Sequence, residues 1–479
     1  VLDRATLLPI AAQSLRAGVT AAPQAVSSDP GIITVAPSSY STTTFSVTAK
    51  SSGTAVLTLT EPEGFTTPAA RRQLTVTVSK PVLTVSGLSV ANGSQALVRF
   101  DNSLYNVNQP LTVTSTDPSR LVLSSDPNVL GGASVTVTSV NSAVYAQALA
   151  GDGSVRVVAS APTFDDGSAV FTLTPSGFGV SVGTEGYPPS AVADKGRYLT
   201  TTQSAKTKLR LFLYSVQGSG VSQVTPRPGL GSVTLSVDSS DSNVGVITGS
   251  PITIQPSSPN YNYNPASVDF VPAGAGSTTV TVTQPPGYTA PGVAARVQFE
   301  VSLPGLQVND VVAAKDTMTS AAVTLGQTVS PQQANLPVTI TSSDPTRVLL
   351  SLDRNSPPGP SVTLTLVARS SSAGPVLIHA LGASGVVPVT ISAPGFATAT
   401  LKVTLADLGF VFSDIYSGTI EAPIQAGAKT LGIIPAIVQS ATNFTTGGFE
   451  IRPGAPDIAV NVQSSDPSVV TVDPGAVVF

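Results

Sequence analysis

One turn motif, Ser-Ser-Asp-Pro or a close variant, recurs along this chain of 479 residues. An Asp at the first corner of a turn can accept a backbone N–H two residues further on, and a following Pro presets the backbone φ angle. A motif that returns at long intervals predicts repeated units, each of which needs the same strand-to-strand turn. The copies begin at Ser27, Ser115, Ser239, Ser342 and Ser464.

The segments between these turns have the pattern of short β-strands. Apolar residues alternate with Thr and Ser in runs such as 54–60, 134–138 and 361–366, which is the period of a strand with one buried face. The 41 Gly and 40 Pro provide turn positions, and no stretch carries a helical period of useful length. Short strands with turns every ~8–12 residues predict an all-β fold of tandem Ig-like β-sandwich domains.

The turns and closing strands divide the chain into five predicted domains. The second and fourth share the long string that continues to Arg120 and Arg347, whereas the third and fifth share an Arg-Pro-Gly at Arg227 and Arg452. These likenesses predict an A-B-A-B-A super-repeat of two domains, with a long opening segment in the third domain and an incomplete fifth domain. The predicted boundaries are 1–79, 80–176, 177–303, 304–405 and 406–479.

The fifth predicted domain stops shortly after its turn. Half of a sandwich would leave an open sheet edge and an uncovered core. Two explanations follow from the sequence. The chain is a window on a longer array, which we favour, or another chain completes the last half-domain by donating strands.

Two motifs resemble those of bacterial immunoglobulin-like repeats. One is the turn with its following Val-rich strand at 464–472, and the other is the Ser-Ala-Pro-Gly-Phe string with its alternating closing strand at 392–404. The likeness extends over nearly the whole chain and is to the Ig-like arrays of large bacterial surface proteins, adhesins and invasin-like proteins. It implies an extracellular or cell-surface location and a stalk or adhesive role, and it brings no catalytic residues. The long opening at 177–217 departs from the compact pattern, so we expect extra strands there.

Composition excludes several classes of function. Charged residues make up 10% of the chain and the net charge is −4, so no basic stripe is present to bind nucleic acid. The absence of Cys excludes disulfides and thiolate metal sites. The sequence contains no apolar run of ~18 residues, so we expect no membrane-spanning helix. A Ser-His-Asp triad would need His379, which lies in an alternating strand. We therefore expect no enzyme, although catalysis by carboxylates alone stays open.

The densest acidic cluster is Asp165 and Asp166 together with Asp152. A solvated loop is the main interpretation, and a calcium site is the alternative. Calcium needs six to eight oxygen ligands, so several carboxylates would have to converge. The corresponding loop of the fourth domain, 397–399, has no carboxylate, which argues against a repeated metal. We expect no cofactor other than this candidate calcium.

Tyr261 and Tyr263 lie among Asn residues in a predicted loop of the third domain. Exposed Tyr rings can stack on sugars or contact a protein partner. A loop without a ligand is the main interpretation, and these two residues are the candidate partner-binding site.

These observations lead to a structural hypothesis and two alternatives. The first hypothesis is a component of a bacterial extracellular fibre, sheath or surface layer, because few charges oppose packing against copies of itself or neighbouring repeats of one long chain. The second is an adhesin or a glycan-binding stalk segment, whose partners would be host or matrix glycans or proteins. The third is an accessory region of a secreted enzyme.

Overall fold

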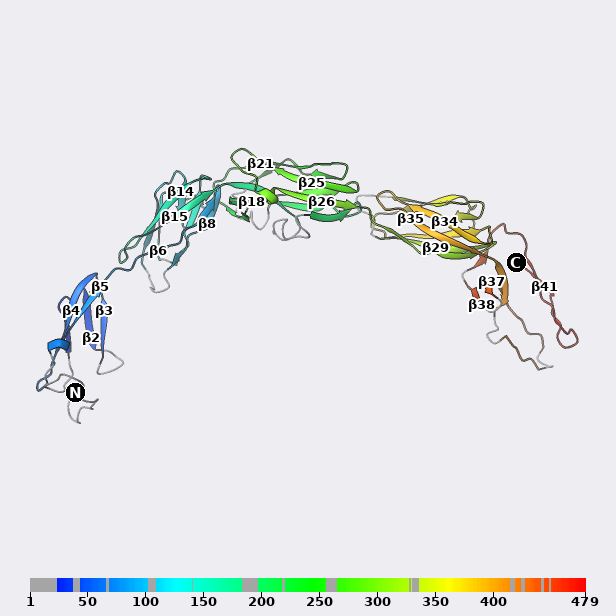
Figure 1. The fold of residues 1–479 in the computed structure, drawn as a ribbon, viewed down its shortest axis with the longest axis horizontal. Helices are drawn as coiled ribbons and strands as arrows, with labels where there is room; N and C mark the ends of the chain where they lie inside the picture. The colour runs from blue at the N-terminus through cyan, green and yellow to red at the C-terminus, as the bar shows by residue number, and fades with distance from the viewer. Residues whose placement is uncertain are drawn as a thin grey trace. The chain divides into compact units, whose positions relative to one another are not determined.

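The computed structural model describes residues 24–37, 44–65, 69–101, 109–139, 141–182, 197–217, 220–255, 265–326, 329, 336–413, 418–423, 427–440, 443–447 and 449–479. The described chain is a succession of β-sheets, and the only helices in these residues are two short 3-10 turns, Ala69–Arg71 and Gly292–Ala295 (Figure 1). This confirms the predicted all-β fold of tandem sandwiches. Among the described residues, no helix has the length and apolar character needed to cross a membrane.

The chain divides into two compact units. The first comprises residues 1–177, 213–233 and 255–264, and the second comprises residues 178–212, 234–254 and 265–479. The two units cut across the predicted third domain, and the five-domain division stays a prediction.

The first unit begins with two small sheets. One has the order β1-β4-β5, and the other pairs β2 with β3. Ile33, Ala55 and Leu57 form the buried core between them. The strands are β1 (Gln24–Ser27), β2 (Ile33–Pro37), β3 (Phe45–Ala49), β4 (Gly53–Thr60) and β5 (Gln73–Val78).

A larger sandwich follows in the same unit. Its sheets have the orders β12-β10-β14-β15-β7 and β11-β13-β8-β20, and a two-stranded pair β6-β9 lies beside them. Alternating strands bury Leu111, Val113 and Phe171 between the sheets. Its strands are β6 (Thr84–Val85), β7 (Ser89–Ala91), β8 (Ser94–Leu97), β9 (Phe100–Asp101), β10 (Leu111–Ser115), β11 (Leu121–Ser124), β12 (Ser134–Val137), β13 (Tyr145–Ala148), β14 (Ser154–Ser160), β15 (Gly167–Thr174) and β20 (Thr225–Pro226).

The second unit opens with sheets of order β16-β18-β24-β22 and β17-β26-β25-β21-β23. Phe270 of one sheet stacks on Phe299 of the other with ring centroids 3.8 Å apart. Strand β17 runs parallel to β26 and is an extra strand in the long opening segment. The strands are β16 (Ser176–Val182), β17 (Arg197–Thr201), β18 (Thr207–Gln217), β21 (Val233–Ser239), β22 (Gly245–Thr248), β23 (Ile252–Ile254), β24 (Ser267–Pro272), β25 (Gly276–Thr283) and β26 (Arg296–Ser302). The last residues of β18 pair with β19 (Gly220–Gln223), and this short hairpin belongs to the first unit.

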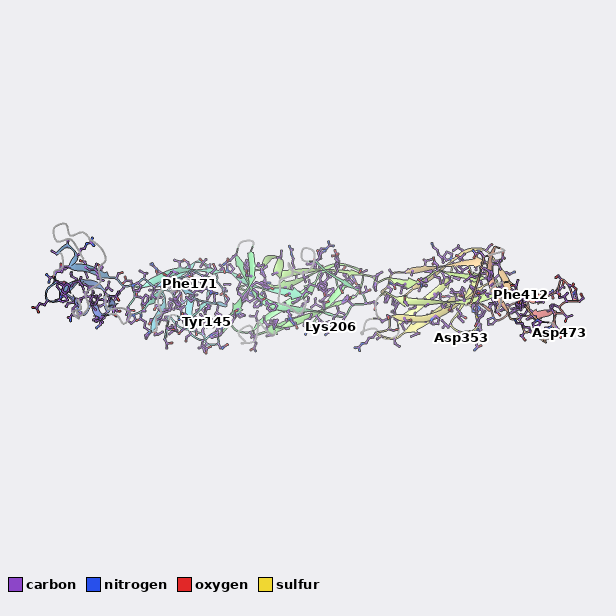
Figure 2. The ribbon with its side chains drawn as sticks, turned by 90° about the horizontal axis from the view of Figure 1, so that it is seen from below. Tyr145, Phe171, Lys206, Asp353, Phe412 and Asp473 are labelled. Atoms are coloured by element: carbon purple, nitrogen blue, oxygen red, sulfur yellow. The ribbon has the colours of Figure 1, made fainter. Side chains whose placement is uncertain are left out.

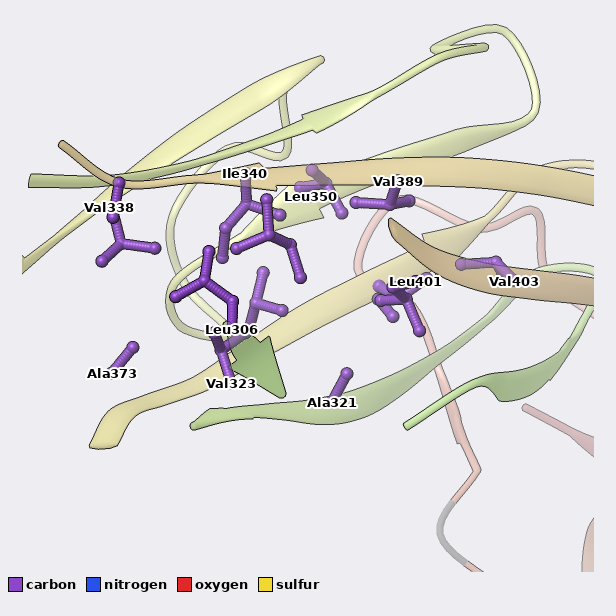
Figure 3. Close-up of a cluster of buried hydrophobic side chains, with 14 of the residues drawn as sticks. Leu306, Ala321, Val323, Val338, Ile340, Leu350, Ala373, Val389, Leu401 and Val403 are labelled. Atoms are coloured by element: carbon purple, nitrogen blue, oxygen red, sulfur yellow. The ribbon is translucent and has the colours of Figure 1, made fainter. Parts of the chain in front are cut away.

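A second large sandwich lies between residues 304 and 406 of this unit. Its sheets have the orders β27-β29-β33-β31 and β28-β35-β34-β30-β32. Figure 3 shows its core, where side chains such as Ile340, Leu350 and Leu401 meet between the sheets. The strands are β27 (Leu306–Val308), β28 (Val311–Ala314), β29 (Thr317–Leu325), β30 (Leu336–Ser342), β31 (Val348–Ser351), β32 (Ser361–Leu366), β33 (Ser372–Ala380), β34 (Gly385–Ser392) and β35 (Ala399–Ala406).

The C-terminal residues of the second unit form smaller sheets, β36-β37-β38 and β40-β41, while β39 pairs with β29. Side chains such as Phe444 and Val470 are half or more exposed there, at 50% and 57%. The strands are β36 (Leu408–Phe412), β37 (Ile433–Ser440), β38 (Asn443–Thr446), β39 (Glu450–Ile451), β40 (Ala459–Asn461) and β41 (Ala476–Val478).

Strand registers repeat between distant segments. β1 pairs with β4 in the register in which β21 pairs with β25, so that Ser27 faces Leu57 as Ser239 faces Val280. Lys206, labelled in Figure 2, has an exposed side chain. It pairs with Asp269 at 2.5 Å. The common register agrees with the predicted likeness of the first and third domains, and the full super-repeat stays a prediction.

Candidate interaction surface on the sandwich edges

The candidate calcium residues lie at two ends of one hairpin. β14 and β15 pair so that Ser154 faces Thr172 and Ala159 faces Gly167. Asp152 therefore lies at one end of the hairpin, whereas Asp165 and Asp166 lie at the other. Asp152 is paired with Arg120 at 3.1 Å. No group of three His, Cys, Asp or Glu suited to a metal occurs in the described ranges.

The candidate partner-binding residues Tyr261 and Tyr263 fall in the stretch 256–264, outside the described residues. Their assignment stays a prediction.

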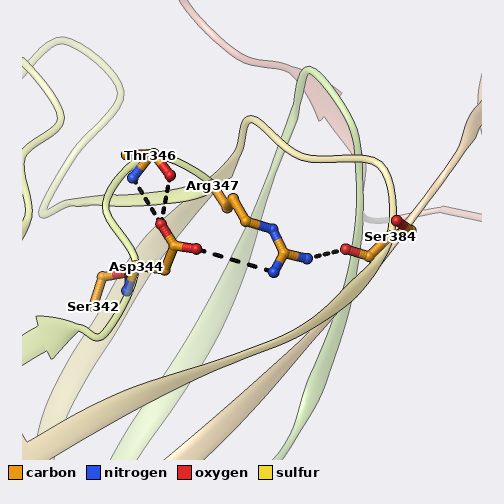
Figure 4. A network of polar contacts seen from close by, with 5 residues as sticks. All are labelled: Ser342, Asp344, Thr346, Arg347 and Ser384. Atoms are coloured by element: carbon orange, nitrogen blue, oxygen red, sulfur yellow. Dashed lines mark hydrogen bonds and ion pairs between the residues drawn. The ribbon is translucent and has the colours of Figure 1, made fainter.

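The recurring turn uses its Asp as a cap. In Figure 4, Asp344 Oδ1 accepts hydrogen bonds from the backbone N–H of Thr346 at 3.1 Å and from its hydroxyl at 2.6 Å. Asp117 and Asp466 accept the same pair of bonds from the Ser two residues further on. Asp29 and Asp241 accept the backbone N–H two residues further on as well. The predicted structural role of this Asp is thus present in all five copies, and each carboxylate is engaged within its own turn.

The two longer copies of the turn contain an arginine whose side chain forms a hydrogen bond with a neighbouring loop. In Figure 4, Arg347 Nη2 donates to the backbone carbonyl of Ser384. In the other long copy, Arg120 Nη2 donates to the backbone carbonyl of Asp152. Each arginine thereby joins the turn to the loop that precedes β34 or β14. Asp152, a candidate metal ligand from the sequence, is a partner in this structural contact.

The most developed polar contact surface of the first unit is the edge formed by β8. β20 adds to this edge as an antiparallel strand, with Thr225 opposite Gln95 and Pro226 opposite Ser94. The Arg227 backbone N–H donates to the carbonyl of Gly93 at 2.9 Å. A free sheet edge leaves backbone N–H and C=O groups unpaired, and strand addition satisfies them. We call this contact of residues 225–230 with the β8 edge the first edge clasp.

Arg227 extends the first edge clasp through its side chain. Its Nε donates to the carbonyl of Ala148 at 3.1 Å, and its Nη1 donates to that of Pro228 at 3.0 Å. Gly93 has a φ of 70°, and the Leu230 side chain lies 3.2 Å from where a Cβ on Gly93 would be. A side chain at position 93 would therefore crowd Leu230 and be strained at this positive φ.

The second unit contains the same contact with different side chains. β39 adds to the start of β29, with Ile451 opposite Thr317 and Glu450 opposite Met318. The Arg452 backbone N–H donates to the carbonyl of Asp316 at 3.0 Å. We call this contact of residues 450–455 with the β29 edge the second edge clasp.

Charges hold the second edge clasp. The Arg452 Nη2 lies 2.8 Å from Asp316 Oδ1, and the two side chains are only 16% and 15% exposed. Arg354 and Glu450 form a further ion pair beside it, on more exposed side chains. Asp316 has a φ of 60°, a left-handed conformation that Asp adopts more readily than most residues.

The two clasps correspond position by position. Both receiving hairpins carry a hydroxyl that donates to a backbone carbonyl three residues earlier at 2.7 Å, Ser94 to Ala91 and Thr317 to Ala314. Strand pairing fixes the other equivalences, because Gln147 faces Gln95 in β13–β8 as His379 faces Met318 in β33–β29. The equivalent positions are Gly93 and Asp316, Ser94 and Thr317, Gln95 and Met318, Gln147 and His379, Arg227 and Arg452, and Leu230 and Ala455.

The residue behind each receiving strand is buried. Gln147 is fully buried and donates from Nε2 to Gln95 Oε1 at 3.1 Å, while its Oε1 accepts from the Gly131 N–H at 2.9 Å. His379 is 1% exposed, and its Nε2 lies 2.8 Å from Ser351 Oγ. Burial, together with the positive charge of Arg452, lowers the pKa of His379. The histidine is therefore neutral at physiological pH.

The lowered pKa of His379 predicts a loss of stability in acid. The unfolded chain has an ordinary imidazole pKa of about 6.5. Just below that pH, the imidazole of the unfolded state binds a proton, whereas that of the folded state stays neutral. The stabilisation is complete above pH ~6.5 and declines as the pH falls toward the depressed folded pKa. We expect the Tm of the 304–406 sandwich to fall between pH 7.5 and 5, measured by thermal unfolding with hydrogen exchange of β33 peptides.

The matched control is His379→Gln, which installs the residue found at position 147. This variant should lose the part of the pH dependence that arises between pH 7.5 and 5. A pH profile parallel to that of the parent chain would contradict the assignment.

The repeated Arg-Pro-Gly string in the sequence marks the position of the two clasps but does not indicate that they add strands to sheet edges. Arg227-Pro-Gly and Arg452-Pro-Gly are visible as a repeat, and their common spacing of 225 residues marks equivalent positions. Strand addition by the two residues before each Arg could not be inferred, because Thr-Pro and Glu-Ile have no common pattern.

In comparisons with known proteins, no family model and no curated protein matches the chain. Domains 4–9 of the surface layer protein SbsC align at 15% identity over 81% of this chain and 60% of that chain, with a TM-score of 0.22. The I9–I11 tandem from titin aligns at 9% identity over 68% and 97%, with a TM-score of 0.21. The Yersinia pseudotuberculosis adhesin InvE aligns at 13% identity over 44% and 56%, with a TM-score of 0.20. This chain thus spans less than two thirds of the length of the SbsC segment that it matches.

Proposed function

We propose that this chain is a structural segment of a bacterial extracellular fibre, sheath or surface layer, in which Ig-like sandwiches in series hold a fixed spacing. The edge clasp supports this proposal best. At two places, 225–230 and 450–455, the chain that leaves a sandwich returns to its edge as an added strand. A loose tether needs no such contact, whereas a spacer that must resist bending does.

The clasps resist bending because their bonds act together. Each contains backbone hydrogen bonds and a side-chain contact from Arg227 or Arg452. A single hydrogen bond contributes only about 0.5–1.5 kcal/mol net. Releasing either added strand from its sheet edge requires several of these bonds to break at once, so the barrier exceeds that of any one bond.

A further contact in the second unit joins segments on either side of a predicted domain boundary. The Thr202 hydroxyl donates to the backbone carbonyl of Gly395 at 2.5 Å, and Thr202 is 7% exposed. Gly395 belongs to the Ser-Ala-Pro-Gly-Phe string, and Phe396 of that string is 5% exposed. The string therefore serves both the core of one sandwich and its junction with the preceding segment.

The proposed role is non-enzymatic. His379, the one histidine of the chain, is buried at the second edge clasp with Ser351 and Arg452 as its neighbours. It is thus not presented to a cleft where it could act as a base. The proposed partners are copies of the chain or neighbouring repeats, and the proposed location is extracellular.

Self-association tests this function. We expect sedimentation velocity to show species larger than a monomer as the concentration rises, and electron microscopy of the same samples to show a regular spacing along each particle. Few surface charges oppose such packing, at 10% charged residues. A monodisperse monomer at high concentration, combined with a positive signal on a glycan array, would instead favour the adhesin alternative.

A further inference from the structure

The two edge clasps share one backbone arrangement but differ at a pair of facing positions. Gly93 faces Leu230 in the first, whereas the equivalent positions in the second hold Asp316 and Ala455. We propose that these pairs make each sandwich edge specific for the segment that follows it. The edge is thus a recognition surface for an extended dipeptide followed by Arg-Pro-Gly, and the residue after Gly decides which edge accepts it.

The first edge requires a large apolar residue after Gly. The Leu230 side chain approaches the Gly93 Cα so closely that an added Cβ would lie 3.2 and 3.3 Å from its two methyl carbons. Gly93 is buried, and the Arg227 side chain donates hydrogen bonds to the backbone carbonyls of Ala148 and Pro228. An Asp at position 93 would place a charge beneath an apolar side chain, which is costly unless the charge is paired.

The second edge requires a small residue after Gly. Asp316 occupies the position equivalent to Gly93, and its carboxylate pairs with Arg452 at 2.8 Å. Ala455, the residue equivalent to Leu230, has only a methyl side chain, and its N–H donates to the Arg452 carbonyl at 3.1 Å. A Leu at position 455 would crowd Asp316 and bury its ion pair further, and a buried pair with imperfect geometry is destabilising.

This pairing explains why one arginine serves two kinds of edge. Where the edge is Gly93, the guanidinium bonds the Ala148 and Pro228 carbonyls. Where the edge is Asp316, the guanidinium turns to the carboxylate. Recognition therefore rests on a constant Arg-Pro-Gly and on a variable pair that matches in size and charge.

Hydrogen exchange of the full chain tests the proposal, because each molecule carries both clasps and each clasp is the control for the other. The readouts are the peptides that contain Arg227 and Arg452, whose N–H groups bond the two edges. We expect Ala455→Leu alone to accelerate exchange about tenfold at the Arg452 peptide and to leave exchange at the Arg227 peptide unchanged. A tenfold change is the size of coupling usual between contacting residues. Gly93→Asp alone should accelerate exchange at the Arg227 peptide and leave exchange at the Arg452 peptide unchanged.

The decisive variants are the doubles. Asp316→Gly with Ala455→Leu converts the second edge to the first type, and Gly93→Asp with Leu230→Ala makes the opposite conversion. Each double should restore slow exchange to within about threefold of the parent, since coupled pairs are non-additive. Doubles that exchange as fast as the sum of the singles would overturn the proposal, as would singles without effect. Loss of protection in the core peptides of β25 and β34 would show global unfolding and would also overturn it.

Discussion

Leu350→Ala should remove about 2–5 kcal/mol from the unfolding free energy of the 304–406 sandwich. Leu350 is fully buried between the two sheets, where it belongs to the cluster that Figure 3 draws. Truncation removes its transfer free energy and leaves a cavity that the sheets cannot fill, because both are fixed by their ladders. Urea denaturation followed by hydrogen exchange of peptides within 336–406 measures the change.

Leu352, two residues further along the chain, provides the matched control. Its side chain is 41% exposed, so Leu352→Ala should change the unfolding free energy by no more than about 0.5 kcal/mol. Equal losses in the two variants would mean that Leu350 does not lie in the core shown here.

Gly131→Ala should destabilise the 80–176 sandwich by about 3 kcal/mol, in the upper part of the range for single substitutions. A Cβ at this position would lie 1.9 Å from the Leu123 carbonyl oxygen and 2.8 Å from the Ser124 nitrogen. Both atoms are backbone of β11, so neither can move without breaking strand hydrogen bonds. The loop would have to leave β11, and the Gly131 N–H would be lost to Gln147.

The neighbouring Gly132→Ala is the control, because a Cβ there meets nothing within 4 Å. The two variants add the same methyl group one residue apart. Their unfolding free energies should therefore differ by most of the loss predicted for Gly131→Ala. The Gly131→Ala variant should also loosen the first edge clasp, since Gln147 supports Gln95. Thermal unfolding with exchange at the Arg227 peptide measures both effects, and equal behaviour of the two variants would contradict the close packing of Gly131.

Local rules made the strands and turns predictable from the sequence. The Asp of the Ser-Ser-Asp-Pro turn caps its turn at Asp344 as the residue chemistry requires. Alternation in 361–366 predicts a strand, and β32 occupies Ser361–Leu366. These features depend on neighbours a few residues apart, and such short-range chemistry is what a sequence shows directly.

The edge clasps could not be predicted because they depend on contacts between residues far apart in the chain, such as Asp316 and Arg452, which are 136 positions apart. Nothing in the local pattern shows that Gly93 and Leu230 meet. The three carboxylates Asp152, Asp165 and Asp166 do not meet in the structure, and this too depends on strand pairing. The register places Asp152 and Asp166 at opposite ends of β14. The register of a hairpin is a property of its pairing, which a count of nearby carboxylates does not contain.

Disulfide trapping tests the edge clasp most directly, because the chain has no cysteine of its own. Gln95 and Thr225 are opposite one another in the β8–β20 pairing. Facing Cα atoms of antiparallel strands lie about 4.5–5.5 Å apart, within the range that a disulfide spans. The Gln95→Cys/Thr225→Cys variant should therefore form an intrachain disulfide under mild oxidation, while the Gln95→Cys/Ser222→Cys control should not. Absence of the bond, or bonds only between chains, would contradict the account.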